Sequence, residues 1–199
     1  PLSGLATTFT ASPSTGTGLV RVSVAQGNIS KQANAAVNVQ AGALDHFAFT
    51  PMPNVRAGQS TYLTITAKDA YDNTITNFSS DVTLNDDLVG IVPTNTGPFS
   101  QGVWTGQVSF QKSGVNKINA SFGAVRTPTD SFTVTPDQLY TADIGPNPLT
   151  VVAGKTQVLT GYGRDRFGNV VENVSYTWSV PSTVGSLSSV DQKEVTLNA

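Results

Sequence analysis

The sequence has 199 residues with a formal net charge of −2, a pI near 5.2, 38% hydrophobic residues and only 12% charged residues. An acidic chain with so few charges lacks the basic face that nucleic-acid binding requires, and charge does not attract it to an anionic membrane. The absence of cysteine excludes disulfides, thiolate metal sites and a cysteine nucleophile. No apolar run is long enough to span a bilayer, so no direct membrane insertion is expected.

Short segments of alternating apolar and polar residues follow one another along the chain, separated by Gly, Pro, Asn and Asp. Apolar residues do not recur at helical spacing, so we expect an all-β protein. The clearest strand is 61–69, where Leu63, Ile65 and Ala67 alternate with polar or aromatic residues. The predicted strands, in chain order, are 5–11, 18–25, 35–39, 44–50, 61–69, 81–85, 89–92, 102–111, 115–122, 130–135 and 175–180.

One stretch of the sequence occurs twice. Ala67–Ile75 returns 96 positions later as Gly163–Val171, with a small residue, a cation, Asp, an aromatic residue and Asn in the same order. Asp, Asn and Gly suit a turn between strands, and a motif that returns at a fixed period indicates an array of one domain type. We therefore predict the C-terminal part of one repeat, a complete repeat and the N-terminal part of a third, at 1–40, 41–136 and 137–199. The complete repeat has about seven short strands, which is typical of an immunoglobulin-like β-sandwich.

Several of these segments resemble a known family. Ala41–Phe47, Ala57-Gly58, the Ala67–Ile75 turn and Gly102–Gly106 resemble tandem bacterial immunoglobulin-like repeats of invasin- and intimin-type adhesins and S-layer-associated surface proteins. The Asp-x-aromatic-Gly-Asn turn is the most specific part of the resemblance, and the central copy departs from it with Asp72 in place of Gly. The resemblance implies an extracellular or cell-surface setting and a role in spacing, adhesion or envelope assembly, and it names no ligand.

The sequence offers no convincing catalytic constellation, so we expect a protein that is not an enzyme. His46 is the only histidine, and it lies on a predicted first strand beside a linker. Adjacent carboxylates occur in predicted turns, where Asp is expected for backbone reasons. No glycine-rich phosphate loop is found. The residues of the repeated turn are instead predicted to be structural: Asp69, Tyr71, Asn73, Asp165, Phe167 and Asn169.

Three kinds of binding or modification site remain as alternatives to this structural interpretation. Calcium takes six to eight oxygen ligands, and the turns offer such oxygens, although a plain turn is favoured. The candidate calcium ligands are Asp69, Asp72, Asn73, Asp165 and Asn169. Sequons for N-glycosylation, no more frequent than chance predicts, lie at Asn28, Asn77, Asn119 and Asn173. A platform of exposed aromatic rings for sugar binding would use Tyr62, Tyr71, Phe78 and Phe167.

The short Ala41-Gly42 link between repeats predicts a stiff rod of domains. Half a sandwich exposes an apolar face, so we expect the partial repeats either to continue in a longer repeat protein or to complement each other between molecules by strand addition. The expected partners are neighbouring repeats or copies of the chain itself, in a filament or array, together with a cell-surface ligand. The expected function is a stalk or spacer of an adhesin, an S-layer or an extracellular filament. The alternatives are a carbohydrate- or receptor-binding adhesin module and an accessory domain of a secreted hydrolase.

Overall fold

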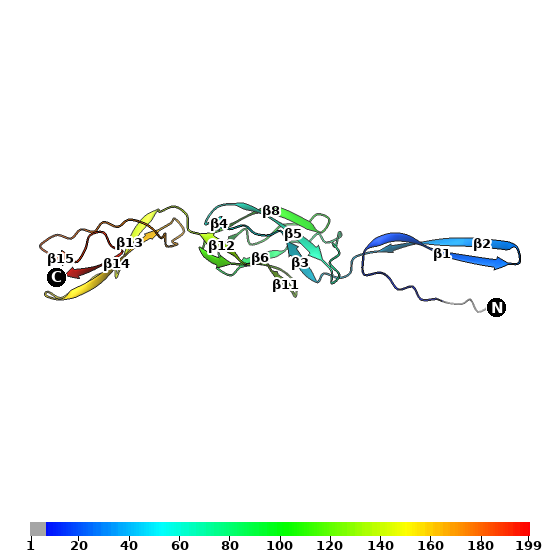
Figure 1. Ribbon diagram of the computed structural model, residues 1–199, viewed down its shortest axis with the longest axis horizontal. Coiled ribbons are helices and arrows are strands. Elements are labelled where there is room, and N and C mark those ends of the chain that lie inside the picture. The colour runs from blue at the N-terminus through cyan, green and yellow to red at the C-terminus, as the bar shows by residue number, and fades with distance from the viewer. Residues whose placement is uncertain (1–6) are drawn as a thin grey trace.

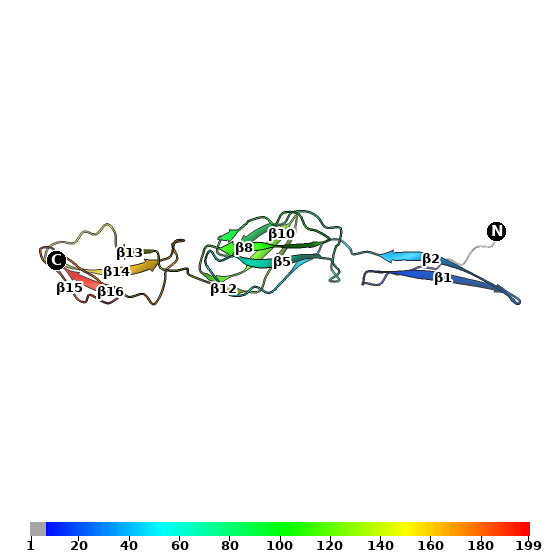
Figure 2. The ribbon, with the colours of Figure 1, turned by 90° about the horizontal axis from the view of Figure 1, so that it is seen from above.

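The computed structural model describes residues 7–199, which form sixteen β-strands and no helix. The predicted all-β class is confirmed. We name three parts of the chain: the hairpin unit (7–40), whose two strands have no buried core, and the central unit (41–136) and the terminal unit (137–199), which have a core each. The units lie end to end along the long axis in two perpendicular views (Figure 1, Figure 2). Within the described residues, no helix is present that would cross a membrane.

The hairpin unit consists of two long antiparallel strands, β1 (Gly16–Gln26) and β2 (Ile29–Val39). The turn between them contains Gly27 at a φ of 56°, a left-handed conformation that glycine adopts without steric cost. Both strands are longer than predicted. The predicted strand over 5–11 is wrong for residues 7–11, which are not in a strand, and its first two residues lie outside the described residues. Alternation alone did not form a strand there, because a strand also needs a neighbour for its backbone hydrogen bonds.

The central unit is a sandwich of two β-layers. One layer has the order β3-β5-β8-β7, and the other is built from the sheets β11-β10-β6 and β4-β12-β9. The first layer contains β3 (His46–Phe49), β5 (Thr61–Lys68), β7 (Ile91–Val92) and β8 (Val103–Phe110). The second contains β4 (Val55–Arg56), β6 (Thr83–Asp86), β9 (Gly114–Asn116), β10 (Ile118–Phe122), β11 (Val125–Pro128) and β12 (Phe132–Thr135). Both layers contribute to one hydrophobic core.

Alternation along β5 fills that core as predicted. Leu63, Ile65 and Ala67 are fully buried, whereas the residues between them remain at least partly exposed. Side chains of the opposite layer, such as Ile118 and Val134, meet them from the other side. Burial of this kind contributes about 25 cal/mol per Å² of apolar surface, so the central unit has the largest hydrophobic stabilisation of the three.

The terminal unit is a single sheet with the order β13-β14-β16-β15. Its strands are β13 (Thr141–Gly145), β14 (Thr156–Arg164), β15 (Ser186–Leu187) and β16 (Glu194–Asn198). Its core is small and centres on Leu159, Val195 and Leu197. The predicted strand over 175–180 is wrong, because this segment does not join a sheet within the described residues.

Candidate functional site: matching joints between the units

The repeated turn follows β5 in the central unit and is closed by the side chain of Asp69. Asp69 is only 2% exposed, and its Oδ1 accepts hydrogen bonds from the backbone N–H groups of Tyr71 and Asn73, both at 2.9 Å. The backbone N–H of Asp69 in turn donates to the carbonyl oxygen of Asn73 at 3.1 Å. A short acidic side chain at the first position thus satisfies the backbone donors of a turn that has no strand partner.

The turn after β14 in the terminal unit repeats this geometry. Oδ1 of Asp165 accepts the N–H groups of Phe167 at 2.8 Å and Asn169 at 2.9 Å, and Asp165 is likewise 2% exposed. The fourth position has a left-handed backbone in both copies, with φ of 64° at Asp72 and 83° at Gly168. The substitution of Asp for the usual Gly therefore preserves the turn, since Asp tolerates this conformation better than most residues do.

The carboxylate introduced by Asp72 has a partner in the central copy. Its Oδ1 lies 3.1 Å from Nε2 of His46, and Nδ1 of the same ring lies 3.0 Å from Oδ2 of Asp45. The histidine therefore bridges the turn and the start of the central unit. Because both ring nitrogens are engaged by carboxylates, this geometry favours a packing role for His46 over a catalytic one.

The second oxygen of each turn aspartate holds the link that enters its own unit. Oδ2 of Asp69 accepts the backbone N–H of Gly42 at 2.8 Å, and Oδ2 of Asp165 accepts that of Asp137 at 2.9 Å. Gly42 follows β2 and Asp137 follows β12, so each bond fixes the chain directly after it leaves the preceding unit. The turn thus immobilises the link.

The turn asparagines reach across to the preceding unit. The Nδ2 group of Asn73 donates to the carbonyl oxygen of Pro13 at 2.7 Å, and its Oδ1 accepts the N–H of Thr15 at 3.2 Å. The amide side chain of Asn73 therefore donates one hydrogen bond to the loop before β1 and accepts one from it, as a backbone peptide group does in a sheet. Its Nδ2 is also held by Oδ2 of Asp69 at 3.0 Å, which orients the amide for this contact.

Asn169 makes the same pair of contacts at the second joint. Its Nδ2 donates to the carbonyl oxygen of Gln111 at 2.8 Å, and its Oδ1 accepts the N–H of Ser113 at 2.9 Å. In both joints the two contacted residues are separated by one residue and precede a strand of the earlier unit. The two joints are thus built on the same Asp and Asn positions of the turn and on the same kinds of hydrogen bond.

The second joint contains additional packing. Phe167 packs against the core of the central unit, and a side chain at Gly58 would overlap its ring. Arg166 lies over that ring at 4.9 Å and forms an ion pair with Asp137 at 3.1 Å. The matching ring of the first joint, Tyr71, is 69% exposed, so the two joints differ in apolar contact and not in their hydrogen bonds.

Hydrogen bonding lowers the pKa of both turn aspartates. For Asp69 the strongest cause is the N–H of Gly42, followed by the amide of Asn73, and burial opposes them. For Asp165 burial is the largest single influence and raises the pKa, but the donors from Asn169, Asp137 and Phe167 together outweigh it. Each carboxylate therefore stays ionised, and in this form it accepts all four of its hydrogen bonds.

A lowered folded-state pKa predicts that acid loosens the joints. The stabilisation is present above the ordinary pKa of 3.8 and is lost as pH falls below that value towards the folded pKa. We expect the urea midpoint of the terminal unit, followed by Trp178 fluorescence, to be constant between about pH 7 and 5 and to fall below about pH 4. In Asp165→Asn the midpoint should be lower at pH 7 and less dependent on acid. An unchanged acid dependence in this variant would contradict the assignment.

The calcium hypothesis stays a prediction, and the geometry describes what it would require. Both oxygens of Asp69 and of Asp165 already accept N–H donors, which a cation would have to displace. Of the candidate ligands, Asp72 is the carboxylate directed away from these donors, towards His46. Among residues 7–199, no group of three or more His, Asp or Glu side chains is placed to hold a metal ion.

The other predicted sites are distributed over the three units. Asn28, Asn77 and Asn173 are exposed, whereas Asn119 lies in β10, is 8% exposed and donates to Asp87, which leaves its amide inaccessible to glycosylation. Of the four candidate sugar-binding rings, Tyr62 and Tyr71 are exposed. The other two are packed: Phe167 at the second joint, and Phe78 among the rings of Phe47, Phe99 and Phe122.

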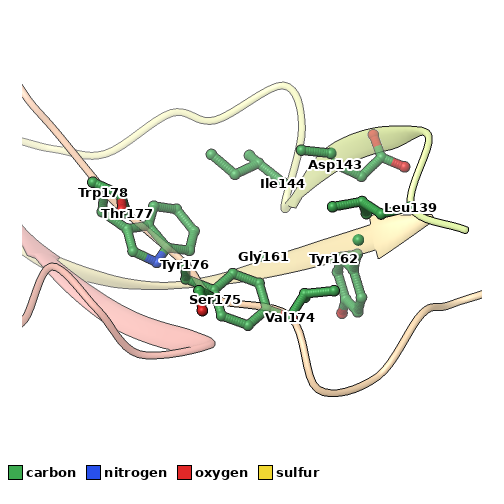
Figure 3. A pocket seen from close by; sticks show the side chains of 12 residues that line it. Leu139, Asp143, Ile144, Gly161, Tyr162, Val174, Ser175, Tyr176, Thr177 and Trp178 are labelled. Carbon is green, nitrogen blue, oxygen red and sulfur yellow. The ribbon is translucent and has the colours of Figure 1, made fainter.

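An apolar groove that no sequence motif predicted lies on the terminal unit. It has a volume of about 160 Å³ and is bordered by Leu139 and Ile144 on one side and by Tyr176 and Trp178 on the other, with Gly161 at its base (Figure 3). Gly161 is buried, and the rings of Tyr176 and Trp178 lie in the space that a side chain at this position would take, so a larger residue would displace them.

Comparison with known proteins yields likenesses only among solved structures. No protein-family model matches the sequence, and no curated protein matches it. The Escherichia coli adhesin FdeC is 20% identical, with a TM-score of 0.45, over 83% of this chain and 59% of FdeC. Yersinia pseudotuberculosis InvD is 17% identical, with a TM-score of 0.45, over 92% of this chain and 60% of InvD. Domains 4–9 of the surface layer protein SbsC are 17% identical, with a TM-score of 0.38, over 91% of this chain and 30% of that one. The chain thus spans less than two thirds of each of these three structures. Adhesins and surface layer proteins are also the classes that the sequence motifs resemble.

Proposed function

We propose that this chain is a non-enzymatic structural segment of an extracellular protein, which serves as a stalk or spacer. The observation that carries the proposal is the joint, in which one turn binds its own link and the preceding unit at both places where units meet. A link between domains without such bonds leaves them free to reorient. Here the turn bonds restrain the link and the neighbouring loop together, which favours a fixed end-to-end arrangement.

The proposed mechanism is mechanical. Each aspartate that closes a turn is buried and holds its link, and each asparagine attaches the loop of the unit before it, so bending at a joint breaks several hydrogen bonds at once. A row of such units, arranged end to end as in Figure 1, keeps the distance between its two ends constant. The resemblance of the turn and link motifs to bacterial surface repeats supports a position outside the cell, in an adhesin stalk, a surface layer or a filament.

The stiffness of the second joint tests the proposal. Spin labels at Lys117→Cys and Lys155→Cys report the distance between the central and terminal units, and the chain contains no cysteine that would interfere. We expect a narrow distance distribution in the otherwise unchanged chain and a broad one when Asn169→Ala removes the bonds to Gln111 and Ser113. The matched control is Asn77→Ala, an exposed asparagine that lies beside the first joint and not the second, which should leave the distance distribution across the second joint narrow.

Two results would contradict the proposal, the first its stiff stalk and the second its account of the joint. A broad distribution in the unmutated chain would mean that the joint does not restrain the units. A narrow distribution that persists in Asn169→Ala would mean that the asparagine bonds are not what restrains them. Circular dichroism on each variant separates both results from unfolding, since the strands of the central unit do not depend on Asn169.

A further inference from the structure

A polar pocket lies at the second joint, where the central unit meets the terminal unit. It has a volume of about 310 Å³ and is lined by residues of both units: Arg56, Ala57, Gly58, Gln59, Asp137 and Arg166. The first four belong to β4 and the tight turn after it, in which the N–H of Gln59 donates to the carbonyl oxygen of Arg56 at 3.0 Å. Two arginines, one from each unit, therefore line a single pocket.

Arg166 is held at one wall of this pocket. Its guanidinium lies over the ring of Phe167 at 4.9 Å and forms an ion pair with Asp137 at 3.1 Å. A Cβ atom at Gly58 would lie only 3.1 Å from Nη2 of Arg166, so the glycine allows the guanidinium to approach the central unit. A guanidinium has five N–H donors, and one ion pair leaves others for a ligand.

Arg56 supplies the second positive charge. It has no ion pair among residues 7–199, and its side chain is exposed. Its backbone is fixed, because Arg56 pairs with Thr135 of β12 and its N–H donates to Oε1 of Gln59 at 3.3 Å. Two arginines and one aspartate give the pocket a formal charge of +1, within a chain whose net charge is −2.

The charged residues of the pocket are not part of the repeat. Asp and Asn of the turn recur in both joints, whereas each charged residue of the pocket has an uncharged counterpart in the other copy: Val152 for Arg56, Ala70 for Arg166 and Gly42 for Asp137. The first joint forms its turn and link bonds without these charges. The fold of the repeat therefore does not require them.

The openness of the pocket follows from the fold of the repeat. Residues 56–59 belong to the central unit, which has both of its layers, and Asp137 and Arg166 belong to a link and a turn. Their counterparts Gly42 and Ala70 are exposed in the central unit although that sandwich is closed. A complete unit thus leaves these positions accessible.

We propose that this pocket binds a sugar that carries a carboxylate, as a uronic-acid residue of an acidic polysaccharide does. A guanidinium binds a carboxylate through two parallel hydrogen bonds, and a pocket with a formal charge of +1 matches one carboxylate better than a doubly charged anion. Sugar hydroxyls donate to the carboxylate of Asp137 and exchange hydrogen bonds with the amide of Gln59, whereas ionised acidic side chains only accept. The inference rests on the proposed joint, because the pocket exists only while the two units keep this arrangement.

Calorimetric titration with trigalacturonate tests the pocket, and maltotriose is the uncharged sugar of the same length. We expect trigalacturonate to bind and maltotriose not to bind. Arg56→Gln removes a guanidinium without breaking an ion pair of the described residues, and it should weaken binding about tenfold or more. Arg56→Lys keeps the charge without the planar fork and should recover only part of the affinity. The matched control is Arg126→Gln, an exposed arginine of β11 outside the pocket, which should bind like the unmutated chain.

Several results would overturn the proposal. They are an absence of trigalacturonate binding, equal binding of maltotriose, and equal losses of affinity in Arg56→Gln and Arg126→Gln. Triglutamate that binds as tightly as trigalacturonate would assign the pocket to an acidic peptide and not to a sugar. Inorganic phosphate that binds as tightly would show that the pocket selects only for charge.

The spin-label distance supplies a second measurement, because a ligand that contacts both units restrains them. In Asn169→Ala, trigalacturonate should narrow the distance distribution between labels at Lys117→Cys and Lys155→Cys, and maltotriose should leave it broad. A distribution that stays broad with trigalacturonate bound would place the sugar outside the joint and overturn the proposal. The distribution of the otherwise unchanged chain is measured without sugar, so a failure of the sugar site leaves the test of the stalk unaffected.

Discussion

The Asp165→Ala variant is expected to unfold its terminal unit at a much lower urea concentration than the unmutated chain. The substitution removes the acceptor of four hydrogen bonds, from Phe167, from Asp137 and from the backbone and side chain of Asn169. Unpaired buried donors cost about 1–3 kcal/mol each, so a loss of about 3 kcal/mol or more is expected. The central unit contains Trp104 and the terminal unit contains Trp178, and the chain has no other tryptophan. Trp178 fluorescence in a Trp104→Phe background therefore reports the terminal unit alone.

The matching variant Asp165→Asn separates charge from shape. An amide keeps one acceptor oxygen but presents an NH2 group to the remaining donors. The stability of Asp165→Asn should therefore lie between that of Asp165→Ala and that of the unmutated chain. Trp104 fluorescence, measured in a Trp178→Phe background, should be nearly unchanged in both variants, because the central unit has its own core. Equal stability of Asp165→Ala and the unmutated chain would show that the turn does not depend on its carboxylate.

Phe110→Ala is expected to produce the largest loss of stability in the central unit. Phe110 ends β8, is fully buried and packs on the ring of Phe132 at a centroid distance of 5.0 Å. Truncating a buried Phe to Ala costs about 3–5 kcal/mol, which is a large part of the roughly 5–15 kcal/mol that stabilises a typical domain. Urea denaturation followed at Trp104, with Trp178→Phe in the background, measures the effect.

Two comparisons qualify the result for Phe110. Phe110→Leu should recover most of the loss, since it refills most of the cavity. Phe9→Ala removes the same side chain from a position that is 59% exposed and outside the core, and it should change the midpoint little. If Phe9→Ala and Phe110→Ala were equally destabilising, β8 would not form part of a closed sandwich core.

Alternation was a sufficient signal for most strands of the sandwich, but not for short edge strands with little apolar pattern or for segments whose state depends on distant neighbours. The range 61–69 was predicted almost to the residue, because Leu63, Ile65 and Ala67 alternate without interruption. β11 was missed because its residues, Val125–Pro128, have little apolar pattern and include a proline at the sheet edge. The range 175–180 has the pattern of a strand and is not one, because no strand of the described residues pairs with it.

The joint was predicted in part. The recurrence of Asp69 and Asp165 identified the turn, and the short Ala41-Gly42 link indicated stiffness. The contacts of Asn73 and Asn169 with the preceding unit were not predicted, because their partners are backbone groups and leave no residue-type signature. Such contacts become visible only when the relative position of the two units is known.

The same feature has a consequence for how such proteins grow. Each turn asparagine recognises the earlier unit through a carbonyl and an N–H, and these groups are present at almost every position of any polypeptide. A copied or deleted unit therefore meets its new neighbour without compensating substitutions, since only loop shape has to be retained. Gene duplication and unequal recombination can lengthen or shorten such an array in single steps, and the number of copies is free to vary while the connection between them stays constant.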